Sequence, residues 1–287
     1  MSQEITFSIS SEQLDRHRQD DRYTQELLNK VAEVGDGIEY VNSELGEYSS
    51  DIKSDIEYAQ QIGLNPETVH LSRLEELDEP EGYTELNTSY HNSQISYDPR
   101  LGTLEPFWDP DNLVFHPPIL ENGDDKKEVM NTVIENMHAV NKLNHSDERI
   151  SGDLLIENMP PVHHTDYMIS KPADIHHMEE IATNEGVESD IQYVLDTGHT
   201  ADCIEMAQSM PSERVQEVHL HNKAKRDDGG WDNHLPPSEG LIDMEEFLNF
   251  YQEELSHADL VLEIKPSEMT PESVEESYDF VQNMLDG

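Results

Sequence analysis

Six short apolar stretches of the sequence each end in a residue that can bind a metal ion. In chain order, the stretches end at His70, His116, Glu157, Asp196, His219 and Glu263. Imidazole nitrogens and carboxylate oxygens are common protein ligands of divalent metals such as Zn²⁺, Mn²⁺, Co²⁺ and Mg²⁺. Charged groups at the end of a buried strand need a partner or a metal, because burying them unpaired is costly. The pattern therefore predicts a divalent-metal site built from strand ends.

More residues of the same types lie close by in the sequence. His199 follows Asp196 by three residues, and Asp232 and His234 lie shortly after His219. These three residues are candidates for further metal ligands. The predicted site could therefore hold more than one ion.

A small basic group lies between His219 and Asp232. Lys223, Lys225 and Arg226 are three of only 17 basic residues in the chain. Two interpretations stay open: a solvated loop, or a group that binds a phosphate of a substrate or a nucleic acid. His221 either joins these substrate contacts or supports a metal ligand.

The elements that must position these residues alternate between β-like and helical patterns. The expected strands are Ile5–Ser10, Ile38–Val41, Glu67–Leu71, Leu113–His116, Asp153–Glu157, Ile191–Asp196, Val215–His219 and Leu260–Glu263. The expected helices are Asp20–Val34, Asp51–Ile62, Lys126–Leu143, Ile175–Thr183, Thr200–Met210, Met244–Leu255 and Pro271–Leu285. Almost continuously apolar strands are typical of a parallel sheet that is buried on both faces.

Repeated β–α units of this number and length predict an α/β fold. The expected architecture is a (β/α)₈ TIM barrel, one domain over residues 1–287, whose active site lies at the C-terminal ends of the strands. A doubly wound open sheet is the alternative, but no G-x-G-x-x-G motif follows the first strand. Residues 72–111 form a long irregular loop after the third strand, either a functional lid or a hairpin. His91 in that loop is an alternative to His70 as the ligand from the third strand.

The charge of the chain points to a salt-rich environment. With 63 acidic and 17 basic side chains the formal net charge is −46. Acidic residues spread along the whole chain, as in proteins of the cytoplasm of halophilic archaea, where molar salt screens the repulsion. No apolar run is long enough for a membrane span, the N-terminus lacks the features of a signal peptide, and Cys203 is the single cysteine. We therefore expect a cytoplasmic, halophilic protein.

Several motifs together resemble one known superfamily. They are TVHLS, VFHPP, LLIENMP, VLDTGH, EVHLHNKAKRDDGGWDNHLPPSEGLID and LVLEIKP, and they span about Glu67 to Pro266. In this order and spacing they resemble the xylose isomerase-like TIM-barrel superfamily. That superfamily includes sugar phosphate isomerases and epimerases and also endonuclease IV, of AP endonuclease family 2.

The resemblance implies roles for the candidate ligands. It makes Glu157, Asp196, His219 and Glu263 the metal set shared across the superfamily. It matches His70, His116, His199, Asp232 and His234 to the further ligands with which endonuclease IV holds three zinc ions. The chain departs from the family pattern at His219-Leu220-His221-Asn222, where His-Leu-x-Asp is usual, and at Ser238-Glu239-Gly240, where Gly-Glu-Gly is usual.

Two reactions follow from the resemblance. The first is metal-dependent isomerisation or epimerisation of a sugar, sugar phosphate or related polyol through an enediolate, with Glu157 and Glu263 removing and returning the proton. The second is phosphodiester hydrolysis at abasic DNA sites by a multi-zinc cluster. The net charge of −46 argues against a nucleic-acid substrate. The preferred expectation is an isomerase or epimerase with a carbohydrate substrate, one of Mn²⁺, Mg²⁺, Co²⁺ or Zn²⁺ as cofactor, no membrane partner and possible homo-oligomers.

Overall fold

The computed structural model provides a description of most of the chain. The described residues are 4–19, 21–41, 52–71, 111–120, 124–147, 153–161, 166–226 and 230–287. Most of the expected loop 72–111, including His91, lies outside these residues. None of the described helices is long and apolar enough to span a membrane.

Eight parallel strands form the centre of the molecule. They are β1 (Ile5–Ser10), β2 (Gly37–Val41), β3 (Pro66–Leu71), β4 (Asn112–Phe115), β6 (Asp153–Glu157), β8 (Gln192–Asp196), β9 (Val215–Leu220) and β12 (Asp259–Leu262). They close into a barrel in the order β1-β12-β9-β8-β6-β4-β3-β2. The predicted TIM barrel is therefore confirmed.

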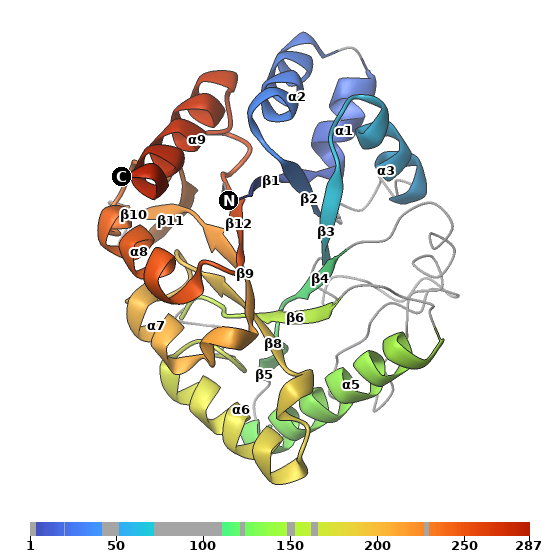
Figure 1. The fold of residues 1–287 in the computed structure, drawn as a ribbon, viewed down its shortest axis with the longest axis vertical. Helices are drawn as coiled ribbons and strands as arrows, with labels where there is room; N and C mark the ends of the chain where they lie inside the picture. Colours follow the sequence, from blue (N-terminus) through green and yellow to red (C-terminus); the bar gives the residue numbers. More distant parts are fainter. Residues whose placement is uncertain are drawn as a thin grey trace.

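Helices surround the barrel (Figure 1). The described α-helices are α1 (Ser11–Arg18), α2 (Arg22–Val34), α3 (Ile52–Gln61), α5 (Lys126–Asp147), α6 (Pro172–Glu185), α7 (Cys203–Ser209), α8 (Met244–Phe250) and α9 (Pro271–Asp286). A π-helical turn, Tyr251–Leu255, extends α8, and short 3₁₀ segments lie at Glu188–Asp190 and Ser212–Arg214.

The chain between β1 and β2 differs from the single helix that the sequence predicts there. Ser10 ends β1 and caps α1, with its hydroxyl accepting from the backbone N–H of Gln13 and the Gln13 side chain reaching back. Asp21 then caps α2 through the backbone N–H of Tyr23. Two separate N-caps therefore split this connection into two helices.

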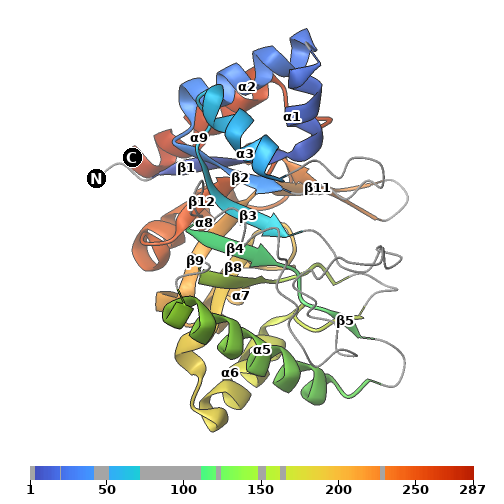
Figure 2. The ribbon, with the colours of Figure 1, turned by 90° about the vertical axis from the view of Figure 1, so that its right-hand side faces the viewer.

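Two small antiparallel pairs lie at one end of the barrel. One is the hairpin β10 (Asn222–Lys225) and β11 (Trp231–Leu235), and the other pairs β5 (Ile119–Leu120) with β7 (Asp166–Tyr167). Both lie on the side to which the barrel strands point, whereas the termini lie on the other side (Figure 2). We call this end, at the C-terminal ends of the strands, the mouth.

A small apolar layer supports the mouth from inside the barrel. Val114, Leu155 and Val194 form a buried cluster that is separate from the main core. The residue two places further along each of these chain segments is a predicted ligand. Alternate residues of a strand face the same way, so the ligands from β6 and β8 and the histidine after β4 point into the barrel.

Candidate functional site

Four predicted ligands from neighbouring strands meet at the mouth. Glu157, Asp196, His219 and Glu263 each offer one ligand atom, and these atoms all lie within 4.8 Å of one another. His219 Nδ1 lies 3.8 Å from Glu157 Oε1 and 3.5 Å from Glu263 Oε2. We call these residues the four-ligand group. Glu157 and Asp196 end β6 and β8, His219 lies in β9, and Glu263 directly follows β12.

A second group forms around the other oxygen of Glu157. His70 Nε2 lies 3.1 Å from His116 Nε2, and Glu157 Oε2 lies 3.4 Å from the former and 3.0 Å from the latter. Ligands about 2.1 Å from a tetrahedral metal are about 3.4 Å apart. The three atoms of this paired-histidine group therefore have the spacing of a metal site.

Glu157 joins the two groups. Its Oε2 faces the paired-histidine group, whereas its Oε1 faces His219 and also lies 3.0 Å from His199 Nδ1. A carboxylate can bind two metals through its two oxygens. This residue is fully buried, so its orientation is fixed by its surroundings.

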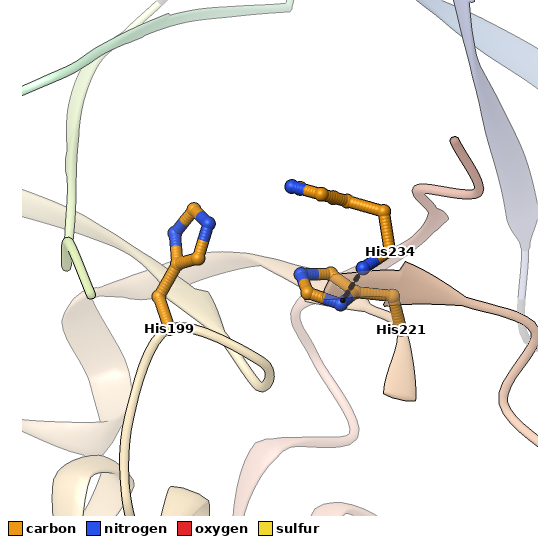
Figure 3. A group of neighbouring side chains, drawn as sticks. All are labelled: His199, His221 and His234. Atoms are coloured by element: carbon orange, nitrogen blue, oxygen red, sulfur yellow. Dashed lines mark hydrogen bonds between the residues drawn. The ribbon is translucent and has the colours of Figure 1, made fainter. Parts of the chain in front are cut away.

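Three histidines form a further cluster, and two of them, His199 and His221, contact Asp196. His199, His221 and His234 each offer a ring nitrogen within 4.8 Å of the others. In this three-histidine group His221 stacks on His234, and His199 faces them (Figure 3). His234 Nδ1 also lies 3.4 Å from Glu263 Oε2. The predicted ligands His199 and His234 are thus beside the four-ligand group.

His221 uses both of its ring nitrogens within the protein. Its Nδ1 accepts a hydrogen bond of 3.0 Å from the backbone N–H of His234, so its Nε2 carries the proton and donates to Asp196 at 3.0 Å. A Cβ on Gly198 would lie 1.8 Å from the His221 ring. The close approach of this glycine lets the His221 ring reach Asp196.

His234 adopts a backbone conformation that few such residues adopt. Its φ of +57° lies in the left-handed region. The backbone N–H donates to His221, and the carbonyl accepts from the backbone N–H of Lys265 at 2.9 Å. Strained residues persist where their surroundings fix them, often at functional sites.

Asp232 is not part of any of these groups. Its Oδ1 accepts a hydrogen bond of 2.6 Å from Lys265 Nζ, and its side chain is 42% exposed. The Lys265 ammonium therefore pairs with a carboxylate that the resemblance matches to one of the further zinc ligands. That assignment stays a prediction.

The basic residues of the hairpin have different surroundings. Lys223 is buried, and its ammonium donates to the carbonyl oxygens of Gly198 and Thr200. Lys225 and Arg226, at the end of β10, are exposed. The buried lysine therefore braces the loop that carries His199.

Several buried atoms at the mouth have no hydrogen-bond partner. Among the described residues, these are Glu39 Oε1 and Oε2, His70 Nδ1, His116 Nδ1, Glu157 Oε1 and Oε2, His219 Nδ1 and Glu263 Oε2. The carboxylate oxygens lie close to imidazole nitrogens but without hydrogen-bond geometry. Buried polar groups are normally satisfied, and these are metal-ligand atoms that converge. The residues therefore fit a divalent metal.

Neighbouring histidines keep the carboxylates of the mouth in the ionised form. Burial raises the pKa of Glu157, but His116, His199 and His70 outweigh it and hold that pKa well below its ordinary value. Burial also raises the pKa of Glu263, and His234 and His219 bring it well below. The carboxylates are therefore ionised at neutral pH, which metal binding requires.

The pKa values of His70, His199, His219 and His234 are raised, whereas burial lowers that of His116. Burial lowers the pKa of His219, but Glu39, Glu217 and Glu263 raise it well above its ordinary value. For His234 burial is likewise outweighed, by Glu263, and the pKa rises to about 9. Without metal, these imidazoles hold protons that a metal must displace.

Three buried residues near the ligands, Asn158, Glu217 and Glu39, are not among the predicted site residues. Asn158 accepts from the backbone N–H of Asp196 and donates to its carbonyl. Glu217 Oε1 lies 2.9 Å from His219 Nε2, and Glu39 Oε2 lies 3.1 Å from the same nitrogen. Glu217 lies two residues before His219, and this spacing on one face of a strand is a signal that could have found it.

Comparisons with known proteins agree with this fold. The family model described as xylose isomerase-like TIM barrel matches residues 110–284. No curated protein sequence matches the chain significantly.

Several solved structures are similar over nearly the whole chain. A putative xylose isomerase from Rhodospirillum rubrum has a TM-score of 0.63 at 13% identity and covers 99% of this chain and 98% of its own. D-allulose 3-epimerase from Methylomonas sp. has a TM-score of 0.61 at 14% identity, with 99% and 98% covered. Mannonate dehydratase from Streptococcus suis has a TM-score of 0.62 at 9% identity, with 99% and 93% covered. At these identities the likeness shows the fold.

Proposed function

The chain belongs to the xylose isomerase-like TIM barrel family, and on this premise we propose that it is a divalent-metal-dependent isomerase or epimerase. Its substrate is a sugar, a sugar phosphate or a related polyol. The observation that carries the proposal is the four-ligand group, whose ligand atoms lie within 4.8 Å of one another at the mouth. Similar folds include a protein named as D-allulose 3-epimerase, which supports the reaction class.

The four-ligand group would hold the ion. Two Glu, one Asp and one His offer mixed oxygen and nitrogen ligation, which suits Mn²⁺, Mg²⁺, Co²⁺ or Zn²⁺. A bound divalent ion supplies Lewis-acid polarisation of substrate oxygens. His221 and Asn158 keep Asp196 oriented for this purpose.

Glu157 and Glu263 move the proton. They come from β6 and from the end of β12, and His219 lies between them, 3.8 Å and 3.5 Å from their nearest oxygens. Both carboxylates are in the basic form, because their pKa values lie well below the ordinary range. The carboxylate that removes a proton from the substrate carbon becomes the acid that can return it; return on the opposite face requires that the other carboxylate has first taken up a proton from water.

Phosphodiester hydrolysis at abasic DNA sites is the second candidate. The paired-histidine group, together with His199 and His234, offers more donors than one ion uses, which favours it. Multi-metal sites stabilise both the attacking and the leaving oxygen of such a reaction. The net charge of −46 opposes it, since DNA binding needs basic surface, and the hairpin offers only the exposed Lys225 and Arg226 beside the buried Lys223.

A hydrogen-exchange assay tests the first candidate. The protein is loaded with Mn²⁺ or Co²⁺ in molar salt and D₂O and incubated with a panel of ketoses, aldoses and their phosphates. We expect one deuterium to enter the carbon that exchanges its proton, in at least one substrate, as seen by mass spectrometry. Glu263→Gln should abolish the exchange, and Glu253→Gln, at an exposed position on the π-helical turn, should leave it unchanged.

A metal count separates the two candidates. In the hydrolase, the double variant Asp232→Ala/His234→Ala should lose one metal from a site of two or three, together with cleavage of an abasic-site oligonucleotide. In the isomerase, a single ion should survive that change. The isomerase would be rejected if the double variant lost one of several metals and the wild type cleaved the oligonucleotide but exchanged no substrate proton.

A further inference from the structure

Glu39 lies beneath the mouth and belongs to none of the predicted ligand sets. It sits in β2, in register with Thr68 of β3, two residues before the level of His70. Its side chain is completely buried, and neither carboxylate oxygen has a hydrogen-bond partner among the described residues. A buried carboxylate without a partner is costly, so this one needs an explanation.

Two metal-facing histidines turn their other ring nitrogen toward Glu39. Glu39 Oε2 lies 3.1 Å from His219 Nε2 and 3.7 Å from His70 Nδ1. The opposite nitrogens, His219 Nδ1 and His70 Nε2, face the four-ligand group and the paired-histidine group. One carboxylate therefore stands behind one histidine of each group.

This arrangement determines which nitrogen of each histidine is free for a metal. A neutral imidazole carries one proton, and a nearby carboxylate favours that proton on the ring nitrogen that faces it, which leaves the other nitrogen as a ligand. We infer that Glu39 is a positioning residue that fixes the ring orientation and the tautomer of both His70 and His219. The inference rests on the proposed metal-dependent function, and it makes one residue control both ligand groups.

Glu217 shares only part of this role. Its Oε1 lies 2.9 Å from His219 Nε2, and its Oε2 accepts from the Thr68 hydroxyl at 2.9 Å and from the Asn112 amide at 3.4 Å. Glu217 thus supports His219 and is itself held in place. His70 Nδ1 has no hydrogen-bond partner among the described residues, and Glu39 is the carboxylate beside it. The dependence on Glu39 should therefore be strongest at the paired-histidine group.

A deep ion bound by Glu39, His70 and His219 is the competing interpretation, because these three also offer converging ligand atoms. Such an ion would need His219 Nε2 and His70 Nδ1. Each ring would then have to bind a metal through both of its nitrogens, or bind no metal at the mouth. The two interpretations differ in what Glu39→Gln changes: the positioning role predicts weaker binding at the mouth, and the deep ion predicts the loss of one ion.

The experiment titrates metal-free protein in molar salt with Co²⁺ and, separately, with Zn²⁺. Binding is followed by calorimetry and by the visible absorption of Co²⁺. Loss of a residue that orients a metal-binding histidine typically costs 10–100-fold in metal affinity. We expect Glu39→Gln to lower the affinity by about 10-fold or more and to change the Co²⁺ spectrum.

Asp55→Asn is the matched control. Asp55, in α3, is another completely buried carboxylate. It pairs with Arg18 and with Tyr40, which lies in β2 next to Glu39, and these contacts are away from the ligands. Its loss should reduce thermal stability while leaving metal affinity within about twofold, since it contacts no predicted ligand. Equal losses of affinity in Glu39→Gln and Asp55→Asn would contradict a positioning role.

Four other outcomes are decisive. Unchanged Co²⁺ affinity in Glu39→Gln would overturn the inference, as would the loss of one bound ion with the remaining ions unaffected, which indicates the deep ion. If Glu39→Gln does not fold, Glu39→Asp takes its place, and its shorter side chain should weaken binding; unchanged binding would again overturn the inference. Metal binding that depends on Glu39 in a protein without sugar isomerase activity would reject the proposed reaction and leave this inference standing.

Discussion

Carboxylates at the two ends of the barrel have pKa values that are shifted in opposite directions. At the mouth, histidines beside Glu157 and Glu263 hold the pKa of each carboxylate well below its ordinary value. At the other end, which we call the base, partial burial and, to a smaller extent, neighbouring acidic groups together raise the pKa values of Glu67 and Asp259 to about 6. The same chemical group is thus kept charged at one end and pushed toward the neutral form at the other.

The difference shows what distinguishes a site from a cluster of acidic residues. In a chain with 63 acidic side chains, carboxylates come together at many places. Only where histidines interleave with them do converging, unpartnered ligand atoms result among the described residues. Perturbed pKa values indicate function when a specific partner of opposite charge causes them in a converging geometry.

The largest expected effect comes from removing the carboxylate that joins two ligand groups. Glu157→Gln should reduce the rate of any metal-dependent reaction by at least about 1,000-fold, because it removes both the proposed metal ligand and the proposed catalytic base. Glu67→Gln at the base is the matched control and should keep nearly full activity. Steady-state kinetics of both variants in molar salt checks this. Comparable activity in the two variants would remove the distinction between mouth and base.

The second expected effect concerns metal binding and pH. Carboxylates raise the pKa values of His70, His199, His219 and His234 despite burial, so metal-free protein holds protons there. A metal must displace them, so its apparent affinity should rise with pH between about 6 and 8, by about tenfold per pH unit for each proton released. Metal titrations in two buffers of different ionisation enthalpy would measure the released protons. An affinity that is flat over this interval would contradict the assigned charge states.

The third effect is a loss of stability in dilute salt. At about 0.01 M salt the Debye length is about 30 Å, so the repulsion from a net charge of −46 acts across the molecule. We expect the unfolding midpoint to fall by roughly 10 °C or more, since 1 kcal/mol shifts the midpoint of a chain this size by roughly 2–4 °C. Circular dichroism melts from molar to millimolar salt check this. A constant midpoint would argue against halophilic adaptation.

The smallest effect lies at the base. The raised pKa of Glu67, about 6 against 4.5, means that the folded protein holds this proton more tightly than the unfolded chain. Its contribution to stability is therefore complete below about pH 4.5 and is lost as pH rises through about 6. Glu67→Gln should remove this loss, so the variant should gain up to a few degrees over the wild type at pH 7 compared with pH 5. A gain of equal size at both values would contradict the shifted pKa.

The barrel could be predicted from the sequence because its signal is strong. Apolar runs such as Asp153–Glu157 and Val215–Leu220 are buried along nearly their whole length, and the observed strands match the expected ones within a few residues. The hairpin β10–β11 was missed because its strands, NKAK and WDNHL, contain no apolar run. Helix α1 was missed because Leu14 is its single buried apolar residue.

The convergence at the mouth could also be predicted, since strand ends in a barrel meet. What the sequence could not reveal is how side chains choose partners across strands. Asp232 pairs with Lys265, 33 residues away, and Glu39 meets His219 from a strand at the opposite end of the chain. Both choices depend on tertiary placement, which spacing along the chain does not encode.

The most direct test of the central claim is the metal content of the protein. The chain is purified in molar salt, incubated with Mn²⁺, Co²⁺ or Zn²⁺, freed of excess ion and analysed by plasma mass spectrometry beside Glu157→Gln. The account predicts at least about one ion per chain in the wild type, as four convergent ligands imply, and a loss of at least one ion in the variant. A wild type that retains no more metal than Glu157→Gln would contradict it.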